Sequence, residues 1–105
     1  MEVSIVDEPM SDRFVIVVDG APAGEITYTA RNDRRLIVHT GVDPSFEGKG
    51  VAGRAAALLL DEVRSRGEQI VPLCPFVHAY IERHPEYDDL VDHRLLAVYE
   101  RPSES

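Results

Sequence analysis

The sequence predicts a mixed α/β (α+β) protein in which an antiparallel sheet is followed by a parallel β-α-β unit. Short apolar runs separated by turn residues fill the first 42 positions, a pattern typical of strands. Residues 51–66 carry apolar side chains at helical spacing. Another apolar run follows at 69–74, and a strand–helix–strand connection of this kind favours parallel pairing.

The first four strands are expected at residues 2–6, 14–18, 23–31 and 36–42. Turn pairs at 19–20 (Asp-Gly) and 32–33 (Asn-Asp) are short, so the second, third and fourth strands should form an antiparallel meander. The run at 14–18 is entirely apolar, which suggests that both of its faces are covered. The first strand leaves an edge with which a second copy could pair, so we expect a monomer or a weak homodimer.

The second half predicts a helix over 51–66, which Gly67 ends as a C-terminal cap. A fifth strand at 69–74 lies parallel to the fourth, and a second helix at 76–83 begins after Pro75 and ends at His84-Pro85. This gives the order β-β-β-β-α-β-α. Residues 1–91 form a single minimal domain and 92–105 a C-terminal extension, in which 95–99 is a terminal strand or a helical turn and the last residues are frayed.

The charge balance excludes several partners. The formal net charge is −8, with one Lys and ten Arg spread along the chain, so we expect no nucleic-acid binding and no anionic membrane surface as partner. No apolar run is long enough to span a bilayer. The first twelve residues carry four acids and no base, unlike a secretory signal, so we expect a cytoplasmic location. A single Cys excludes an intramolecular disulfide and a cysteine-based zinc cluster.

A glycine loop lies between the fourth strand and the long helix, at residues 47–53 (Glu-Gly-Lys-Gly-Val-Ala-Gly). Its glycines permit close backbone approach, and the first N–H groups of the helix and the helix dipole favour an anion such as a pyrophosphate. The loop lacks the Lys-Ser/Thr pair of a Walker motif, and three antiparallel strands precede it, unlike a dinucleotide fingerprint. The alternative is a loop whose glycines serve only for turning.

Several segments together resemble a known family. The order of elements, the strand end at 39–44 (His-Thr-Gly-Val-Asp-Pro) and the glycine loop look like the core of a GCN5-related N-acetyltransferase, or GNAT. The stretch 70–77 (Ile-Val-Pro-Leu-Cys-Pro-Phe-Val), with 80–81 and 83–87 (Arg-His-Pro-Glu-Tyr), is similar to the small, single-domain, YjdJ-like branch of that superfamily. The resemblance covers residues 3–91.

The resemblance implies an acetyl-CoA-dependent N-acetyltransferase that acts on an unidentified amine, small or protein-borne. The alternative is a non-catalytic module of the same fold that binds CoA or another protein. The loop backbone would hold the pyrophosphate of acetyl-CoA, and the pantetheine arm would run along 38–42. The cofactor-binding residues implied are Val42, Glu47, Gly48, Lys49, Gly50, Val51, Ala52 and Arg54. One departure is Glu47, which stands where the superfamily usually has Arg or Gln.

Cys74 lies at the end of the fifth strand, a position that faces the acetyl group in the family. It would receive the acetyl group or line the pocket, and the alternative is a buried, inert thiol. Simple alternation puts His39 on one face with Ile37 and Gly41, and the family pattern implies that it lies near Cys74 and accepts a proton. The alternative for His39 is a structural histidine bonded to a loop.

Tyr80 lies on the second helix, where many acetyltransferases of the superfamily use a tyrosine to protonate the departing CoA thiolate. The alternative is a tyrosine that only packs in the core. His78, His84 and His93 are expected at the surface or at helix ends, and no metal site is expected because no acidic partner stands at ligand spacing.

Overall fold

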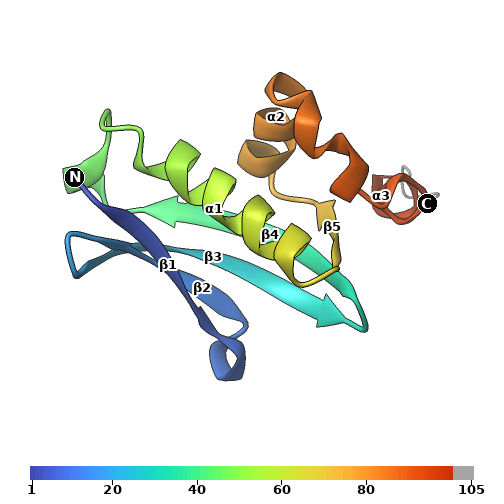
Figure 1. The fold of residues 1–105 in the computed structure, drawn as a ribbon, viewed down its shortest axis with the longest axis horizontal. Helices are drawn as coiled ribbons and strands as arrows, with labels where there is room; N and C mark the ends of the chain where they lie inside the picture. The colour runs from blue at the N-terminus through green and yellow to red at the C-terminus, as the bar shows by residue number, and fades with distance from the viewer. Residues whose placement is uncertain (101–105) are drawn as a thin grey trace, which may run out of the picture.

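A five-stranded sheet in the order β1-β2-β3-β4-β5 forms the centre of the computed structural model, which describes residues 1–100 (Figure 1). The first four strands pair antiparallel with their neighbours, and β5 is parallel to β4. The predicted fold class is therefore confirmed. The strand bounds are β1 (Val3–Glu8), β2 (Arg13–Val18), β3 (Ala21–Arg31), β4 (Arg34–Val42) and β5 (Gln69–Pro72).

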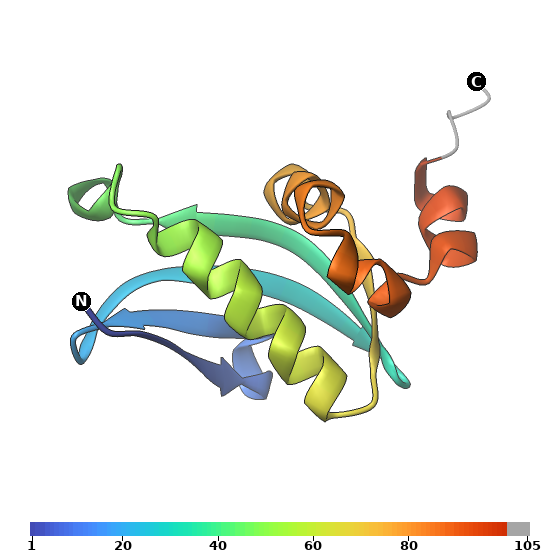
Figure 2. The same cartoon turned by 45° about the horizontal axis from the view of Figure 1, so that its top comes forward.

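The helices α1 and α2 lie side by side over one face of this sheet, and α3 lies beyond the β5 edge (Figures 1 and 2). Segment 95–99 is thus helical, which was one of the two expectations for it. The predicted frayed end falls outside the described residues. No helix within 1–100 is both long and apolar enough to cross a membrane. The helix bounds are α1 (Val51–Ser65), α2 (Pro75–Arg83) and α3 (His93–Glu100), with 3-10 turns η1 (Pro9–Ser11), η2 (Pro44–Phe46) and η3 (Pro85–Leu90).

The core lies between the sheet and α1. On β2, Phe14, Ile16 and Val18 are buried, whereas Val15 and Val17 are only half-buried. The expectation that both faces of this strand are covered is therefore wrong. The reason is that α1 and α2 pack on the same face, so no helix of residues 1–100 covers the opposite face of β2 (Figure 2).

Strands β4 and β5 pair only over a short distance. Residues 34–37 of β4 pair with 69–72 of β5, and the Cys74 N–H then donates to the Ile37 carbonyl at 2.8 Å. Pro72 has no N–H with which to extend the ladder, and α2 begins three residues later. Within the described chain no strand pairs with this edge of β4 at 38–42. The sheet therefore opens beside the second half of β4.

A β-bulge at Val38 changes the direction of the β4 side chains. Thr27 of β3 pairs with His39 while Tyr28 pairs with Ile37, so Val38 is an extra residue in β4. As a consequence Ile37 and Thr40 share the face covered by the helices, and His39 points to the opposite face. The prediction that Ile37 and His39 share a face is wrong, because simple alternation does not hold across a bulge.

Candidate functional site

The glycine loop joins β4 to α1 through η2. Asp43 begins this turn, and its carboxylate accepts hydrogen bonds from the Ser45 N–H at 2.9 Å and the Ser45 hydroxyl at 2.8 Å. These two bonds hold the pKa of Asp43 below its usual value, so it stays ionised. Gly48 and Gly50 have φ of +79° and +75°, the left-handed region that favours glycine. The loop conformation thus depends on both glycines.

Some amides of the loop donate to backbone carbonyls within the protein, and others do not; we call the latter open amides. The Glu47 N–H donates to the Pro44 carbonyl at 3.1 Å, and the Lys49 N–H donates to the Phe46 carbonyl at 3.4 Å. Because these two amides already donate within the turn, only part of the loop backbone can bind a pyrophosphate, and not all of it as predicted. Within residues 1–100 no backbone carbonyl accepts from the amides of Gly48, Gly50, Val51, Ala52 and Gly53. The open amides cluster at the start of α1, where the helix dipole also attracts an anion.

A hollow of about 330 Å³ lies beside these amides. Phe46, Val51 and Phe76 give it apolar walls, and Val42 links it to the end of β4. Glu47 is exposed on its rim, and Lys49 and Arg54 are exposed nearby. The Lys49 ammonium lies 5.9 Å from the centre of the Phe46 ring. This arrangement suits a ligand that carries a phosphate at one end and an apolar chain beyond it.

Cys74 lies where β5 gives way to α2 and is only 2% exposed. Its Sγ lies 3.4 Å from the Oγ1 of Thr40, which is half-buried on β4. The hollow reaches Phe76, two residues further along, but Cys74 itself is not part of its lining. The thiol therefore lies behind the wall of the hollow, at the point where β4 and β5 separate.

His39 is exposed on the opposite face of the sheet. It lines a shallow hollow of about 570 Å³ together with Arg13, Glu25 and Gly41. The expectation that His39 lies near Cys74 is therefore wrong, and the cause is the bulge at Val38. Thr40 is the residue that takes this place. Sequence reasoning missed it, because a His-Thr pair near a strand end does not reveal which of the two side chains turns toward the helices.

Tyr80 projects from α2 toward α1. Its ring lies 3.9 Å from the point that a Cβ on Gly53 would occupy, and it stacks on the His84 ring with centroids 4.0 Å apart. Burial, with smaller contributions from the charges of Glu86 and Asp61, raises the pKa of Tyr80. The phenol therefore keeps its proton at neutral pH. Because Gly53 also lines the hollow, Tyr80 lies next to its wall.

The other two histidines contact acids at the surface. His78 lies 3.2 Å from the carboxylate of Glu82, and His93 lies 3.1 Å from that of Asp88. Among residues 1–100 no group of three or more His, Cys, Asp or Glu side chains is placed to hold a metal ion.

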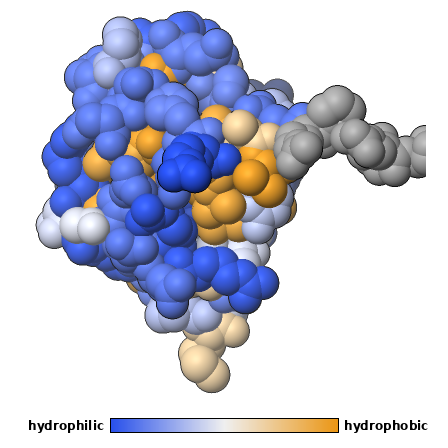
Figure 3. All heavy atoms as spheres, turned by 90° about the vertical axis from the view of Figure 1, so that its right-hand side faces the viewer, coloured by the Kyte–Doolittle hydropathy of each residue, from blue (hydrophilic) through white to orange (hydrophobic). Residues whose placement is uncertain are grey.

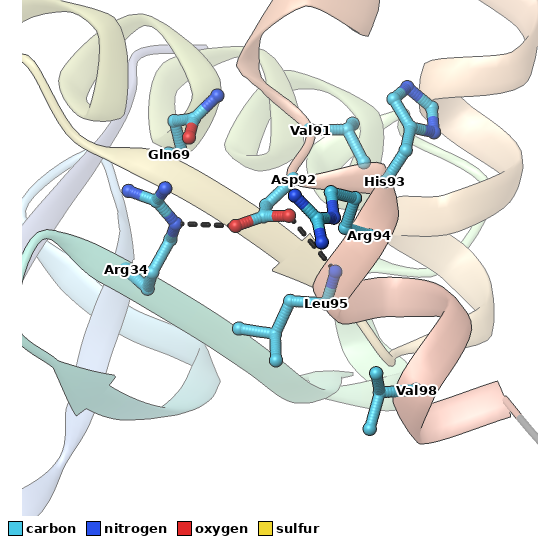
Figure 4. A pocket seen from close by; sticks show the side chains of 8 residues that line it. All are labelled: Arg34, Gln69, Val91, Asp92, His93, Arg94, Leu95 and Val98. Carbon is cyan, nitrogen blue, oxygen red and sulfur yellow. Dashed lines mark hydrogen bonds and ion pairs between the residues drawn. The ribbon is translucent and has the colours of Figure 1, made fainter.

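A larger hollow, of about 670 Å³, lies at the opposite end of β4, between the start of that strand and α3 (Figure 4). Arg34 Nε donates to the Asp92 carboxylate at 2.7 Å, and the same carboxylate caps α3 by accepting from the Leu95 N–H at 2.9 Å. These bonds attach α3 to the sheet. The role of these contacts is structural. The charges of Arg34 and Asp92 neutralise one another.

Comparison with known proteins gives consistent findings. A family model described as GCN5-related N-acetyl-transferase matches residues 13–90. Among solved structures, the NMR solution structure of a GCN5-like protein from Staphylococcus aureus, itself a proposed N-acetyltransferase, matches with a TM-score of 0.63 and 26% sequence identity. That match covers 84% of this chain and 86% of the other. No curated protein sequence matches the chain. Since the family model spans most of the chain and the solved relative shares its fold, the chain belongs to the GCN5-related N-acetyltransferases and is an acetyltransferase by class.

Proposed function

We propose that this protein transfers the acetyl group of acetyl-CoA to an amine acceptor. The observation that carries the proposal is the group of open amides at the start of α1, beside a hollow that continues along β4 to α2. Family members use acetyl-CoA as the acetyl donor, and the site offers what a pyrophosphate and an apolar pantetheine arm require.

The donor would lie with its pyrophosphate on the amides of Gly48 and of residues 50–52, and the Lys49 and Arg54 cations would add attraction from the rim. Its pantetheine arm would extend past Val42 toward Phe76. This direction carries the thioester toward the unpaired edge of β4. Backbone N–H groups of β4 would polarise the thioester carbonyl there.

Two routes of transfer fit this arrangement. In direct transfer, the neutral amine attacks the acetyl carbon, the bond to the CoA sulfur breaks, and the amine proton passes to water. In the second route, the Cys74 sulfur first takes the acetyl group and the amine then removes it. In both, the departing CoA thiolate needs a proton, which the Tyr80 phenol would supply. Its position beside the wall of the hollow and its retained proton support this role. Holding donor and acceptor together is the main catalytic contribution.

His39 takes no part in activating Cys74 in this proposal, because the two side chains lie on opposite faces of the sheet. Glu47 would turn its exposed side chain toward solvent, and its neighbours' amides would supply the binding.

A second candidate function is a CoA-binding module without turnover. The 2% exposure of Cys74 favours it, since a buried thiol needs movement of its neighbours before it can react.

The proposal is tested by calorimetric titration with acetyl-CoA and with CoA, followed by turnover assays on a panel of amines. Saturable micromolar binding with acetylated product supports it, whereas no binding up to millimolar acetyl-CoA contradicts it. Tight binding without product on any amine favours the second function. Intact-mass analysis, with Cys74→Ala as the control, shows whether the acetyl group stays on the protein. Equal turnover by wild type and Cys74→Ala would rule out the route through Cys74.

A further inference from the structure

We propose that Thr40 is a positioning residue that holds the Cys74 thiol for reaction, an inference that rests on the proposed acetyl transfer. The Thr40 hydroxyl is 3.4 Å from the Cys74 sulfur. Within the described chain it is the one side-chain polar atom that forms a hydrogen bond with this sulfur. It comes from the unpaired half of β4, directly across the opening between β4 and β5.

The backbone around the pair fixes both partners. The Val38 bulge turns Thr40 to the helix-covered face, where Ile26 of β3 is its neighbour across the sheet. On the other strand, the Cys74 N–H donates to the Ile37 carbonyl, which holds Cys74 against β4 just before the strands separate. The contact therefore follows from the bulge and from the end of the ladder.

A threonine hydroxyl can serve both charge states of the thiol. It accepts the S–H of a neutral thiol, and after rotation it donates its O–H to a thiolate. A buried thiolate without a donor is strongly disfavoured, and hydrogen bonds to a charged partner are stronger than those to a neutral one. Thr40 should therefore keep the sulfur directed toward the opening and supply a hydrogen-bond donor to the negative charge that the sulfur carries when it reacts.

In the route through Cys74, the thiolate sulfur attacks the acetyl carbon and the bond from that carbon to the CoA sulfur breaks. The Thr40 hydroxyl releases its hydrogen bond as the sulfur loses its negative charge. Cys74 gives its proton to water before the attack, and the CoA thiolate takes up one proton after it leaves. The number of protons is therefore unchanged. Thr40 itself forms no covalent bond and exchanges no proton.

The test follows the rate at which iodoacetamide alkylates Cys74, measured by intact mass, which is unambiguous because the chain has one Cys. Thr40→Val keeps the shape and removes the hydroxyl. We expect it to slow the reaction of Cys74 about tenfold, because the reacting sulfur loses its hydrogen-bond donor. Thr40→Ser should restore the wild-type rate. Thr29→Val, at a half-buried position on β3, is the matched control and should change nothing.

An unchanged alkylation rate in Thr40→Val would overturn the proposal, as would equal losses of rate in the Val and Ser variants, which would indicate packing alone. If Thr40→Val does not fold, Thr40→Ala is the second hydroxyl-free variant. Calorimetry on the wild-type protein separates this proposal from the proposed function. Wild-type protein that fails to bind acetyl-CoA would refute the proposed function, while the alkylation rate still decides the role of Thr40.

Discussion

Asp7 links the edge strand to the rest of the molecule through a partly buried charge cluster. It accepts a hydrogen bond from the Tyr28 hydroxyl at 2.5 Å and another from Arg66 Nη1 at 2.9 Å. Arg35, buried on β4, lies 3.9 Å from the same carboxylate and pairs with Glu68 at 2.9 Å. One carboxylate thus connects β1, β3, β4 and the end of α1, at the opposite end of β4 from the glycine loop.

Asp7→Asn should lower the free energy of unfolding by about 1 to 2 kcal/mol, because Arg66 and Arg35 lose a charged partner. Burial alone would raise the pKa of Asp7, but hydrogen bonds from Tyr28 and Arg66 and the arginine charges hold it below 3.8. The pKa of Asp7 is lower in the folded state than in the unfolded state. This stabilisation is therefore complete above the unfolded pKa and is lost as the pH falls through the folded pKa. Chemical denaturation at several pH values measures both effects. Asp33→Asn, an exposed partner of Arg34, is the control and should leave the unfolding midpoint nearly unchanged.

Tyr28 should be the last tyrosine to ionise. Burial and the hydrogen bond to Asp7 raise its pKa to about 12, from an ordinary 10.0. Because the folded pKa exceeds the unfolded one, Tyr28 contributes full stability below pH 10.0 and loses that contribution as pH rises toward about 12. Alkaline titration of the tyrosinate absorbance tests this expectation. Tyr28→Phe should remove the highest ionisation step, and a titration that keeps this step would contradict the account.

At the scale of the element, α1 is bounded by two glycines in the same left-handed backbone conformation. Gly50 at its start has φ of +75° and Gly67 beyond its end has φ of +68°. An alanine at either position would meet no atom within 4 Å, so only the backbone conformation opposes it. Each replacement should therefore destabilise the fold by about 1 kcal/mol.

Only Gly50→Ala should also weaken acetyl-CoA binding, because Gly50 shapes the loop that presents the open amides. Gly67→Ala is the matched control, with similar loss of stability and unchanged affinity. Calorimetry and thermal unfolding on both variants give the two measurements. Equal affinity in the two variants would show that the ligand does not contact the start of α1.

The sequence revealed some elements more readily than others. The glycine loop, the helix after it and the β4–β5 pairing were predictable because turn residues and apolar periodicity mark them locally. The bulge at Val38 was not, since an extra residue in an apolar strand changes neither composition nor turn signals. Without the bulge, the faces of the sheet on which His39 and Thr40 lie could not be predicted either. The link between Asp7 and Arg66 was also hidden, because nothing local pairs charges 59 positions apart.

At the scale of the whole molecule, α3 lies on the edge of the sheet and is attached by a few contacts. Leu96 is buried, the Asp92 N–H donates to the Ile70 carbonyl at 3.0 Å, and Arg34 pairs with Asp92. On this side of the molecule, apolar side chains lie surrounded by polar ones (Figure 3). Val98 of α3 is 58% exposed.

A chain that ends at residue 91, the predicted domain boundary, should fold but lose about 2 to 4 kcal/mol of stability, because removing α3 uncovers the surface that Leu96 covers. Circular dichroism and chemical denaturation of 1–91 and of the full chain provide the comparison. A truncated chain that stays unfolded would refute the boundary, whereas equal stability would mean that α3 contributes nothing to the fold.

The central claim is that acetyl-CoA binds on the helix-covered side, with its phosphates at the start of α1. The most direct test is an NMR titration of ¹⁵N-labelled protein with acetyl-CoA. The largest amide shifts are expected at Gly48, at residues 50–52, and at Val42 and Phe76, with small shifts at Arg13 and Glu25 on the open face. Shifts centred on the open face, or on the hollow between β4 and α3, would contradict the account.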